Sequence, residues 1–404
     1  MKAAAKQYRA EMNTAYTILF AISTSHFFND SIQSVVPALF PILEQSLRLT
    51  YTQIGWIAFV VNMTSSVMQP IFGYYADERP TPFLLPLGMF LSMIGLIGLA
   101  FSPNFYLILL SVLFIGLGSA VFHPEGSRVA YMAAGDKRGL AQSIYQVGGN
   151  FGQSMAPVFA ALIFVPLGQK GTLSFTLITV SGIILLLYVS KWYRYKISTD
   201  FIPPRRLKKK SNKETGSIDK KIQISMFLLV FIVFARTWYS AGITNFYQFY
   251  LIDDYGLSIQ RAQIYIFIFL IAGVIGTFSG GPLADRFGKR NMIFLSMVGA
   301  IPFTLILPYV PLALVLPLFF IIGFIVTSSF SVTVVYAQDL LPKKIGMVSG
   351  LIVGFAFGMG AIGAVLFGTL ADIFSIKFVM ILCSLLPLCG FLGWFLPPDH
   401  KIRQ

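Results

Sequence analysis

The sequence predicts an all-α membrane protein that crosses the bilayer many times, and three observations support this fold class. Of the 404 residues, 56% are hydrophobic and only 11% are charged, whereas a soluble globular domain carries roughly 25% charged residues. Apolar runs of about 20 residues recur along the chain, and each is long enough to span a bilayer as a helix. The runs are apolar on all sides, unlike the alternating strands of a β-barrel. A soluble enzyme and a β-barrel are therefore excluded.

The apolar runs predict twelve helical spans. They cover residues 14–43, 53–75, 82–101, 105–134, 138–165, 173–193, 222–250, 258–280, 291–309, 312–338, 344–370 and 375–396. The first run is too long for a cleaved signal peptide, lacks a small-residue cleavage site and carries polar residues in its middle. We therefore expect it to remain as a membrane helix.

Lysine and arginine are distributed unequally between the two sides of the predicted membrane. If both termini are cytoplasmic, the inner segments hold 24 of these residues and the outer segments hold four. Basic residues accumulate in cytoplasmic connections of membrane proteins. The bias predicts a multi-pass protein of the cell membrane with cytoplasmic termini. The net charge of +14 then reflects topology, and we expect no nucleic-acid partner.

The two halves of the chain repeat one another. The predicted organisation is an N-terminal six-helix half at 1–193, a basic cytoplasmic linker at 194–221 and a C-terminal six-helix half at 222–404. Glycine landmarks recur at nearly constant offsets, Gly73 with Gly281 at 208 residues and Gly148 with Gly354 at 206. Such repeats are typical of transporters, whose substrate site lies near the bilayer midplane between the halves.

Four charged residues fall inside predicted spans, namely Asp30, Glu125, Arg128 and Arg236. Each costs roughly 2.5–3.5 kcal/mol at the membrane centre on insertion scales. Because their formal charges sum to zero, we expect them to pair with one another or to share a polar cavity.

Four spans present a polar face. The candidate residues are His26, Asn29, Asp30 and Gln33 on span 1; His123, Glu125 and Arg128 on span 4; Gln142, Gln146 and Asn150 on span 5; and Arg236, Tyr239 and Asn245 on span 7. A central water-filled cavity would satisfy these groups. We assign proton coupling to Asp30, Glu125, His123 and Arg128, and substrate binding to the others.

Structural roles remain alternatives for these residues. Glu125 and Arg128 lie three positions apart on one helix and could form a plain ion pair. Arg236 could be the counter-ion of Asp30 or Glu125, and the span 5 amides could only join helices.

Residues 281–290 resemble a motif of the major facilitator superfamily, the Gly-x-x-x-Asp-Arg-x-Gly-Arg/Lys-Arg/Lys loop. The residues that match are Gly281, Asp285, Arg286, Gly288 and Arg290. The first-half copy keeps only Gly73 and Asp77, since Glu78-Arg79-Pro80 follows and the second glycine is lost. The resemblance implies a cytoplasmic gate in which Asp285 accepts from the amides at a helix N-terminus.

Longer stretches resemble the fosmidomycin resistance branch of this superfamily. They are residues 25–34, 121–130, 139–152, 335–342 and 345–350. The resemblance implies a proton-driven efflux antiporter for a drug-like molecule such as fosmidomycin, with no cofactor or metal. We expect its partners to be a small-molecule substrate, protons and the lipid bilayer, and we expect a monomer.

Alternative functions also follow from the polar spans. Protonating a carboxylate frees an arginine partner for an anion, which favours symport, so uptake of a sugar or small organic anion remains open. A channel is disfavoured by the repeat and the midplane charges. An enzyme is disfavoured because zinc motifs and a nucleophile elbow are absent from the sequence.

Overall fold

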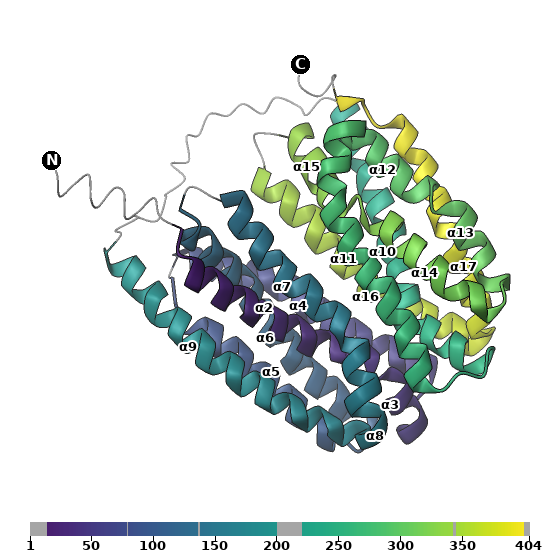
Figure 1. Ribbon diagram of the computed structural model, residues 1–404, viewed down its shortest axis with the longest axis horizontal. Helices are drawn as coiled ribbons and strands as arrows, with labels where there is room; N and C mark the ends of the chain where they lie inside the picture. The colour runs from purple at the N-terminus through teal and green to yellow at the C-terminus, as the bar shows by residue number, and fades with distance from the viewer. Residues whose placement is uncertain (1–13, 79, 136–137, 200–219, 342–344, 400–404) are drawn as a thin grey trace. The chain divides into compact units, whose positions relative to one another are not determined.

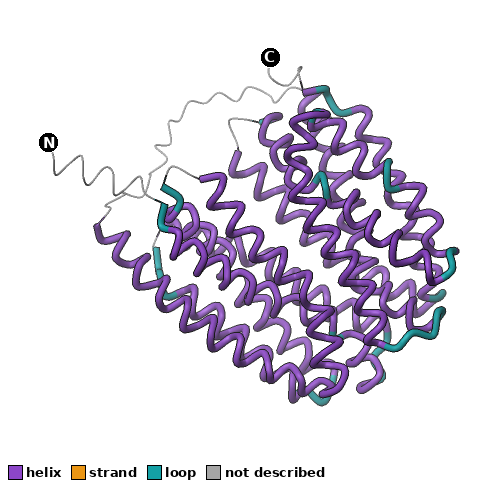
Figure 2. The backbone as a smooth tube through the Cα atoms, viewed as in Figure 1, coloured by secondary structure: helices purple, strands orange, loops and turns teal. Residues whose placement is uncertain are grey.

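The computed structural model describes residues 14–78, 80–135, 138–199, 220–341 and 345–399. Every regular element in these ranges is a helix (Figures 1 and 2). The first half contains α2 (Tyr16–Ala38), α3 (Phe40–Leu47), α4 (Tyr51–Glu78), α5 (Leu84–Phe101), α6 (Phe105–Ala133), α7 (Arg138–Phe159), a π-helix (Ala160–Phe164), α8 (Val165–Leu167), a 3₁₀-helix (Gly168–Ser174) and α9 (Phe175–Thr199). The second half contains α10 (Lys220–Asp253), α11 (Ile259–Phe287), α12 (Lys289–Val298), α13 (Ile301–Ile306), a 3₁₀-helix (Leu307–Tyr309), α14 (Leu312–Thr327), α15 (Phe330–Leu340), α16 (Ile345–Ile373), α17 (Ile376–Leu385) and a 3₁₀-helix (Leu386–Phe395).

Each of the twelve predicted spans coincides with helix in the described residues. Nine helical stretches there are long and apolar enough to cross a membrane. The smaller number arises partly because Leu140–Thr199 forms one continuous stretch of 60 residues that contains two predicted spans. The all-helical membrane fold is thus confirmed, whereas the count of twelve stays a prediction.

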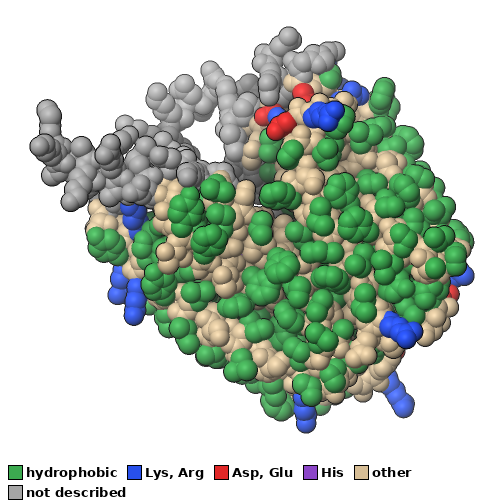
Figure 3. Space-filling view, in the orientation of Figure 1, with side chains coloured by type: hydrophobic (Ala, Val, Ile, Leu, Met, Phe, Trp, Pro, Cys, Tyr) green, Lys and Arg blue, Asp and Glu red, His purple; other side chains and the backbone are tan. Residues whose placement is uncertain are grey.

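The helical surface is apolar, as a lipid environment requires. Hydrophobic side chains cover most of the face shown in Figure 3, and lysine and arginine side chains lie toward its margins. Leu162, Leu177 and Phe278 are each more than 70% exposed. Large exposed apolar surfaces of this kind mark contact with a partner or a membrane.

Close packing divides the chain into two compact units, whose boundaries differ from those of the sequence halves. The described residues of the first unit fall within 14–35, 67–156 and 169–199, and those of the second within 36–66, 157–168 and 220–399. In the first unit, α5 packs against α6 and α9. In the second, α10 packs against α16, and α11 packs against α14.

Proline breaks the first span at the junction of α2 and α3, within the second unit. Pro41 has no N–H to donate to the carbonyl of Pro37 one turn earlier. That carbonyl instead accepts from Gln248 Nε2 of α10 at 2.9 Å, and the Ala38 carbonyl accepts from Gln263 Nε2 of α11 at 3.3 Å. The proline break therefore ties first-half backbone to second-half helices.

The π-helix makes a comparable connection in the second unit. Gln260 Nε2, near the start of α11, donates to the carbonyl of Ala161 at 3.2 Å. The N-terminal end of α11 thus packs on the C-terminal end of the predicted fifth span.

Candidate functional site

Two glycines bring α7 into backbone contact with α2 and so position the site. A Cβ on Gly148 would lie 2.9 Å from the carbonyl carbon of Ser23, and one on Gly152 would lie 3.1 Å from that of Phe27. Real Cβ atoms do not approach backbone so closely, so only glycine permits this packing. By contrast, an added Cβ on Gly354 or Gly358 of α16 meets no atom of the described residues within 4 Å.

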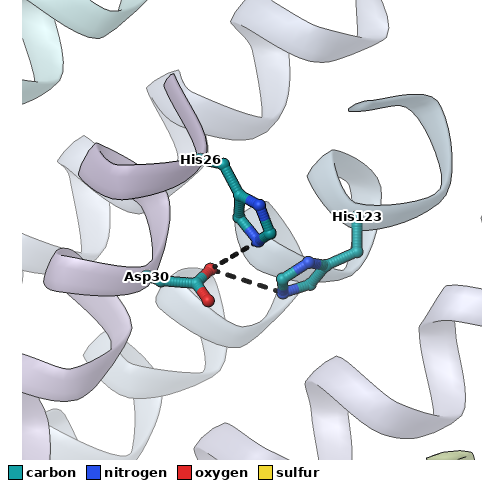
Figure 4. Close-up of side chains that lie close together, drawn as sticks. All are labelled: His26, Asp30 and His123. Carbon is teal, nitrogen blue, oxygen red and sulfur yellow. Dashed lines mark ion pairs between the residues drawn. The ribbon is translucent and has the colours of Figure 1, made fainter. Parts of the chain in front are cut away.

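Beside this packing lies a buried cluster of three titratable side chains from α2 and α6, shown in Figure 4. Asp30 Oδ1 lies 3.4 Å from His26 Nε2, one turn earlier on α2. It also lies 3.6 Å from His123 Nε2, which comes from α6. Asp30 and His26 are almost completely buried, whereas the side chain of His123 is 26% exposed. His123 is therefore the member of the cluster that solvent reaches.

Amide side chains satisfy the remaining capacity of the Asp30 carboxylate. Asn29 Nδ2 donates to Oδ1 at 3.0 Å, and Gln153 Nε2 of α7 donates to Oδ2 at 2.9 Å. Asn29 also donates to Ser119 Oγ of α6 at 3.4 Å, and Ser119 donates to Gln33 Oε1 at 2.6 Å. Predicted polar residues of α2 therefore contact both α6 and α7.

A backbone contact fixes which nitrogen of His26 carries a proton. His26 Nδ1 lies 2.8 Å from the carbonyl oxygen of Tyr145, and the Tyr145 ring stacks on the imidazole with a centroid separation of 4.1 Å. A carbonyl only accepts, so Nδ1 must be the donor. In neutral imidazole, Nε2 then carries a lone pair that faces the Asp30 carboxylate. Two facing acceptors require one shared proton to make a favourable contact.

The three side chains could also be considered as metal ligands. Their ligand atoms lie within 4.8 Å of one another. A closed tetrahedral metal site takes four protein ligands, whereas three also suit an open site whose fourth position a water or substrate fills. The expectation that no metal binds here therefore stays a prediction.

The other candidate residues of the first unit are arranged in two groups. Arg128 Nε lies 3.8 Å from Glu125 Oε1, and Arg128 Nη1 donates to the carbonyl of Ala76 at 2.7 Å. Gln146 Nε2 lies 3.5 Å from Asn150 Oδ1, at the limit of a hydrogen bond. Gln142 and Gln146 are exposed. The Glu125–Arg128 ion pair anticipated as an alternative is present.

The candidate residues of the second unit centre on Arg236 of α10. The residue is buried, with a relative exposure of 3%. Nη1 donates to Ser329 Oγ at 2.7 Å and to Thr333 Oγ1 at 3.3 Å, both from the α15 region. Nη2 has no hydrogen-bond partner among the described residues. No carboxylate pairs with Arg236 in that part of the chain, so its positive charge is uncompensated there.

Two further residues of α10 lie near Arg236 in sequence. Tyr239 is buried, and its hydroxyl lacks a partner among the residues described. Asn245 donates to the carbonyl of Ala241 in its own helix at 2.9 Å.

The motif at 281–290 forms the turn between α11 and α12. Gly288 has a φ of 87°, a conformation that favours glycine. Asp285 and Arg286 are exposed, and a Cβ on Gly281 would meet no atom within 4 Å.

The amides at the start of α12 are capped by a residue outside the motif. Asp399 accepts from the backbone N–H of Lys289 at 2.6 Å and of Arg290 at 3.1 Å. Arg290 donates to the carbonyl of Trp394. Asp399 thus caps α12, and the expectation that Asp285 caps a neighbouring helix stays a prediction. In the first-half copy, Gly73 is half-buried beside Pro124, and the Asp77 side chain lies outside the described residues.

Three contributors to the first-unit site were not among the predicted site residues, namely Ser119, Tyr145 and Gln153. Gln153 continues the series Gln146 and Asn150 along α7, so helical spacing could have identified it. Tyr145 acts through its backbone carbonyl, which no residue pattern reveals.

Comparisons with known proteins agree with the arrangement of the helices. The family model described as Major Facilitator Superfamily matches residues 19–361 and 228–403. A bacterial homologue of the human lysosomal transporter Spinster, solved in an inward-facing and occupied conformation, superposes with a TM-score of 0.77 at 15% identity, covering 96% of this chain and 98% of that chain. At that identity the likeness shows the fold alone.

Two bacterial relatives are similar over nearly the whole sequence. An uncharacterized MFS-type transporter, YfnC, of Bacillus subtilis is 54% identical over 97% of this chain and 95% of its own length. The fosmidomycin resistance protein of Escherichia coli is 45% identical over 96% of this chain and 95% of its own length.

Proposed function

Since the chain belongs to the major facilitator superfamily and is thus a membrane transporter, not an enzyme, we propose that it is a proton-coupled efflux antiporter. Its proposed cargo is a small drug-like molecule such as fosmidomycin, because a relative with 45% identity is a fosmidomycin resistance protein. We place it in the cell membrane with both termini in the cytoplasm, in line with the distribution of lysine and arginine.

The facing acceptors of His26 and Asp30 carry this proposal. With Nδ1 donating to Tyr145, the 3.4 Å contact between His26 Nε2 and Asp30 Oδ1 is favourable only when a proton lies between them. The cluster is buried, so the uncompensated state is costly. We propose that this pair takes up one proton from outside and releases it to the cytoplasm, with the partly exposed His123 as the exchange group.

The partners of Asp30 bear on the choice between antiport and symport, because symport is favoured when protonation of a carboxylate frees an arginine for an anion. Within the described residues Asp30 is held by histidines and amides, and no arginine pairs with it. Protonating Asp30 therefore does not free an arginine for an anion. A substrate O–H or N–H donated to the same acceptors would instead take the place of the proton. Proton and substrate then exclude each other, as antiport requires.

Arg236 is the proposed group for an anionic part of the substrate. Arginine binds phosphonate-like oxyanions through two parallel N–H donors. Nη1 is already held by Ser329 and Thr333, whereas Nη2 has no partner among the described residues. A bound phosphonate or carboxylate would neutralise a charge that is otherwise costly inside a membrane protein.

Everted membrane vesicles that are energised to be acidic inside test the proposal. Adding fosmidomycin to wild-type vesicles is expected to raise the internal pH as protons leave. Asp30→Asn should abolish this rise, because the amide cannot ionise. Asp254→Asn is the matched control, since Asp254 is an exposed acid outside both candidate groups.

The outcomes separate the alternatives. Gradient-driven transport by Asp30→Asn at the wild-type rate would overturn the proton assignment. A fall in internal pH on adding substrate would indicate symport, and so favour proton-coupled movement of a sugar or organic anion. Arg236→Lys should weaken transport of an anionic substrate more than that of a neutral analogue.

A further inference from the structure

The carboxylate of Asp372, in the second repeat, caps the N-terminus of α4 in the first repeat. Asp372, at the end of α16, accepts from the backbone N–H of Tyr51 at 2.8 Å and of Thr52 at 2.7 Å, one on each oxygen. These amides are the unsatisfied donors at the N-terminus of α4. All three residues belong to the second unit, although 320 positions separate Thr52 from Asp372 in sequence.

Glycines allow the two helices to meet without interlocking side chains. A Cβ on Gly368, one turn before Asp372, would lie 2.8 Å from the carbonyl carbon of Tyr51. A Cβ on Gly55, one turn after Tyr51, would lie 2.9 Å from the Cα of Val365. Sequence numbers rise along α4 as they fall along α16, so the helices form an antiparallel seam of backbone contacts.

A second element of the second repeat joins the seam at the same end. The hydroxyl of Tyr51 donates to Asp253 Oδ2, the last residue of α10, at 2.6 Å. Tyr51 therefore contacts α16 through its backbone and α10 through its side chain. Residues 44–52, 251–257 and 371–374 all fall in connections predicted to lie outside the cell.

We propose that Asp372 is a releasable cap that closes the outer side of the transporter. Movement of one repeat against the other must separate α4 from α10 and α16 before a central site can open outward. This inference rests on membership of the superfamily and does not depend on proton coupling or on the cargo.

The chemistry of the cap suits reversible closure. Asp372 is exposed, and water can satisfy both its carboxylate and the amides of Tyr51 and Thr52 after separation. Asp372 is therefore a positioning residue, which sets the balance between the closed and open outer ends through α4.

Distance measurements between spin labels on the full-length protein in nanodiscs test the cap. Labels at Gln45→Cys and Phe374→Cys, two exposed positions flanking the seam, report the outer separation in a background without Cys383 and Cys389. We expect Asp372→Ala to lower the ratio of short to long distances about fivefold, the effect of removing an ordinary helix cap. Asp372→Asn, which keeps one acceptor, should fall between Asp372→Ala and wild type.

Two further variants separate the cap from general damage. Asp254→Ala removes an exposed acid close to Asp253 in sequence and should leave the distances unchanged. Gly368→Ala should lengthen them by forcing α16 away from Tyr51. Wild-type distances in Asp372→Ala would overturn the cap, and unchanged distances in Gly368→Ala as well would overturn the seam. Monomeric elution on size exclusion establishes that each variant is folded before labels are read.

Discussion

Replacing Gly149 with alanine is expected to disable the cluster of His26, Asp30 and His123 without removing any of its groups. Gly149 lies on α7, where an added Cβ would sit 2.5 Å from Cε1 of His26 and 2.9 Å from Oδ2 of Asp30. Ordinary Cβ contacts begin at 3.4 Å, so the imidazole must shift by about 1 Å in a close-packed interior. That shift breaks the 2.8 Å contact between Nδ1 and the Tyr145 carbonyl.

The size of the effect follows from the cost of overpacking, about 1–3 kcal/mol. Since each 1.4 kcal/mol changes a rate about tenfold, substrate-dependent proton release should fall roughly 5- to 150-fold if the cost falls on the cluster. Gly354→Ala is the control, because an added Cβ there meets no atom within 4 Å in the part of the chain that the structure describes. Wild-type proton release by correctly folded Gly149→Ala would refute the tautomer argument.

Two other predictions concern stability. Gly280→Ala should lower the free energy of unfolding by about 1–3 kcal/mol, because its Cβ would lie 2.9 Å from the carbonyl carbon of Ser328. Gly281→Ala should be neutral, because its Cβ meets nothing within 4 Å among the described residues. Equal melting temperatures for the two variants would contradict this prediction. Burial and the charge of Asp253 raise the pKa of the Glu44 carboxyl outside the predicted spans. The ionised form is thus disfavoured in the folded state, so this group's contribution to stability is lost as pH rises through the raised pKa. Glu44→Gln should raise the melting temperature relative to wild type at pH 8 but not at pH 4, and a pH-independent difference would count against this.

The parts of the site that lie on one helix could be predicted from the sequence. His26 and Asp30 are one turn apart, and so are close whenever the segment is helical. The same holds for Glu125 and Arg128 at three positions. Apolar length predicted the helices themselves, because a bilayer leaves few other ways to satisfy backbone groups.

The parts that depend on packing between helices could not be derived from spacing. Formal charges that sum to zero made a carboxylate one expected partner of Arg236, yet its observed partners are the hydroxyls of Ser329 and Thr333. Neutral donors and acceptors can solvate a buried charge locally, so charge balance does not identify pairs. The approach of His123 to Asp30 likewise depends on the packing of α6 on α2.

The contact between Gln260 and the π-helix differs in charge from the contact that Asp372 makes, so the two sides of the proposed outer closure are not equivalent. By the internal repeat, the start of α11 and the end of the fifth span correspond to the start of α4 and the end of α16. The first pair is joined by a neutral amide on the Ala161 carbonyl, and the second by the exposed, charged Asp372. Dissolved salt weakens the attraction between an exposed charge and a helix terminus and barely affects neutral hydrogen bonds. Rising ionic strength is therefore expected to loosen the α4–α16 seam first, so that the outer end opens in an order set by charge.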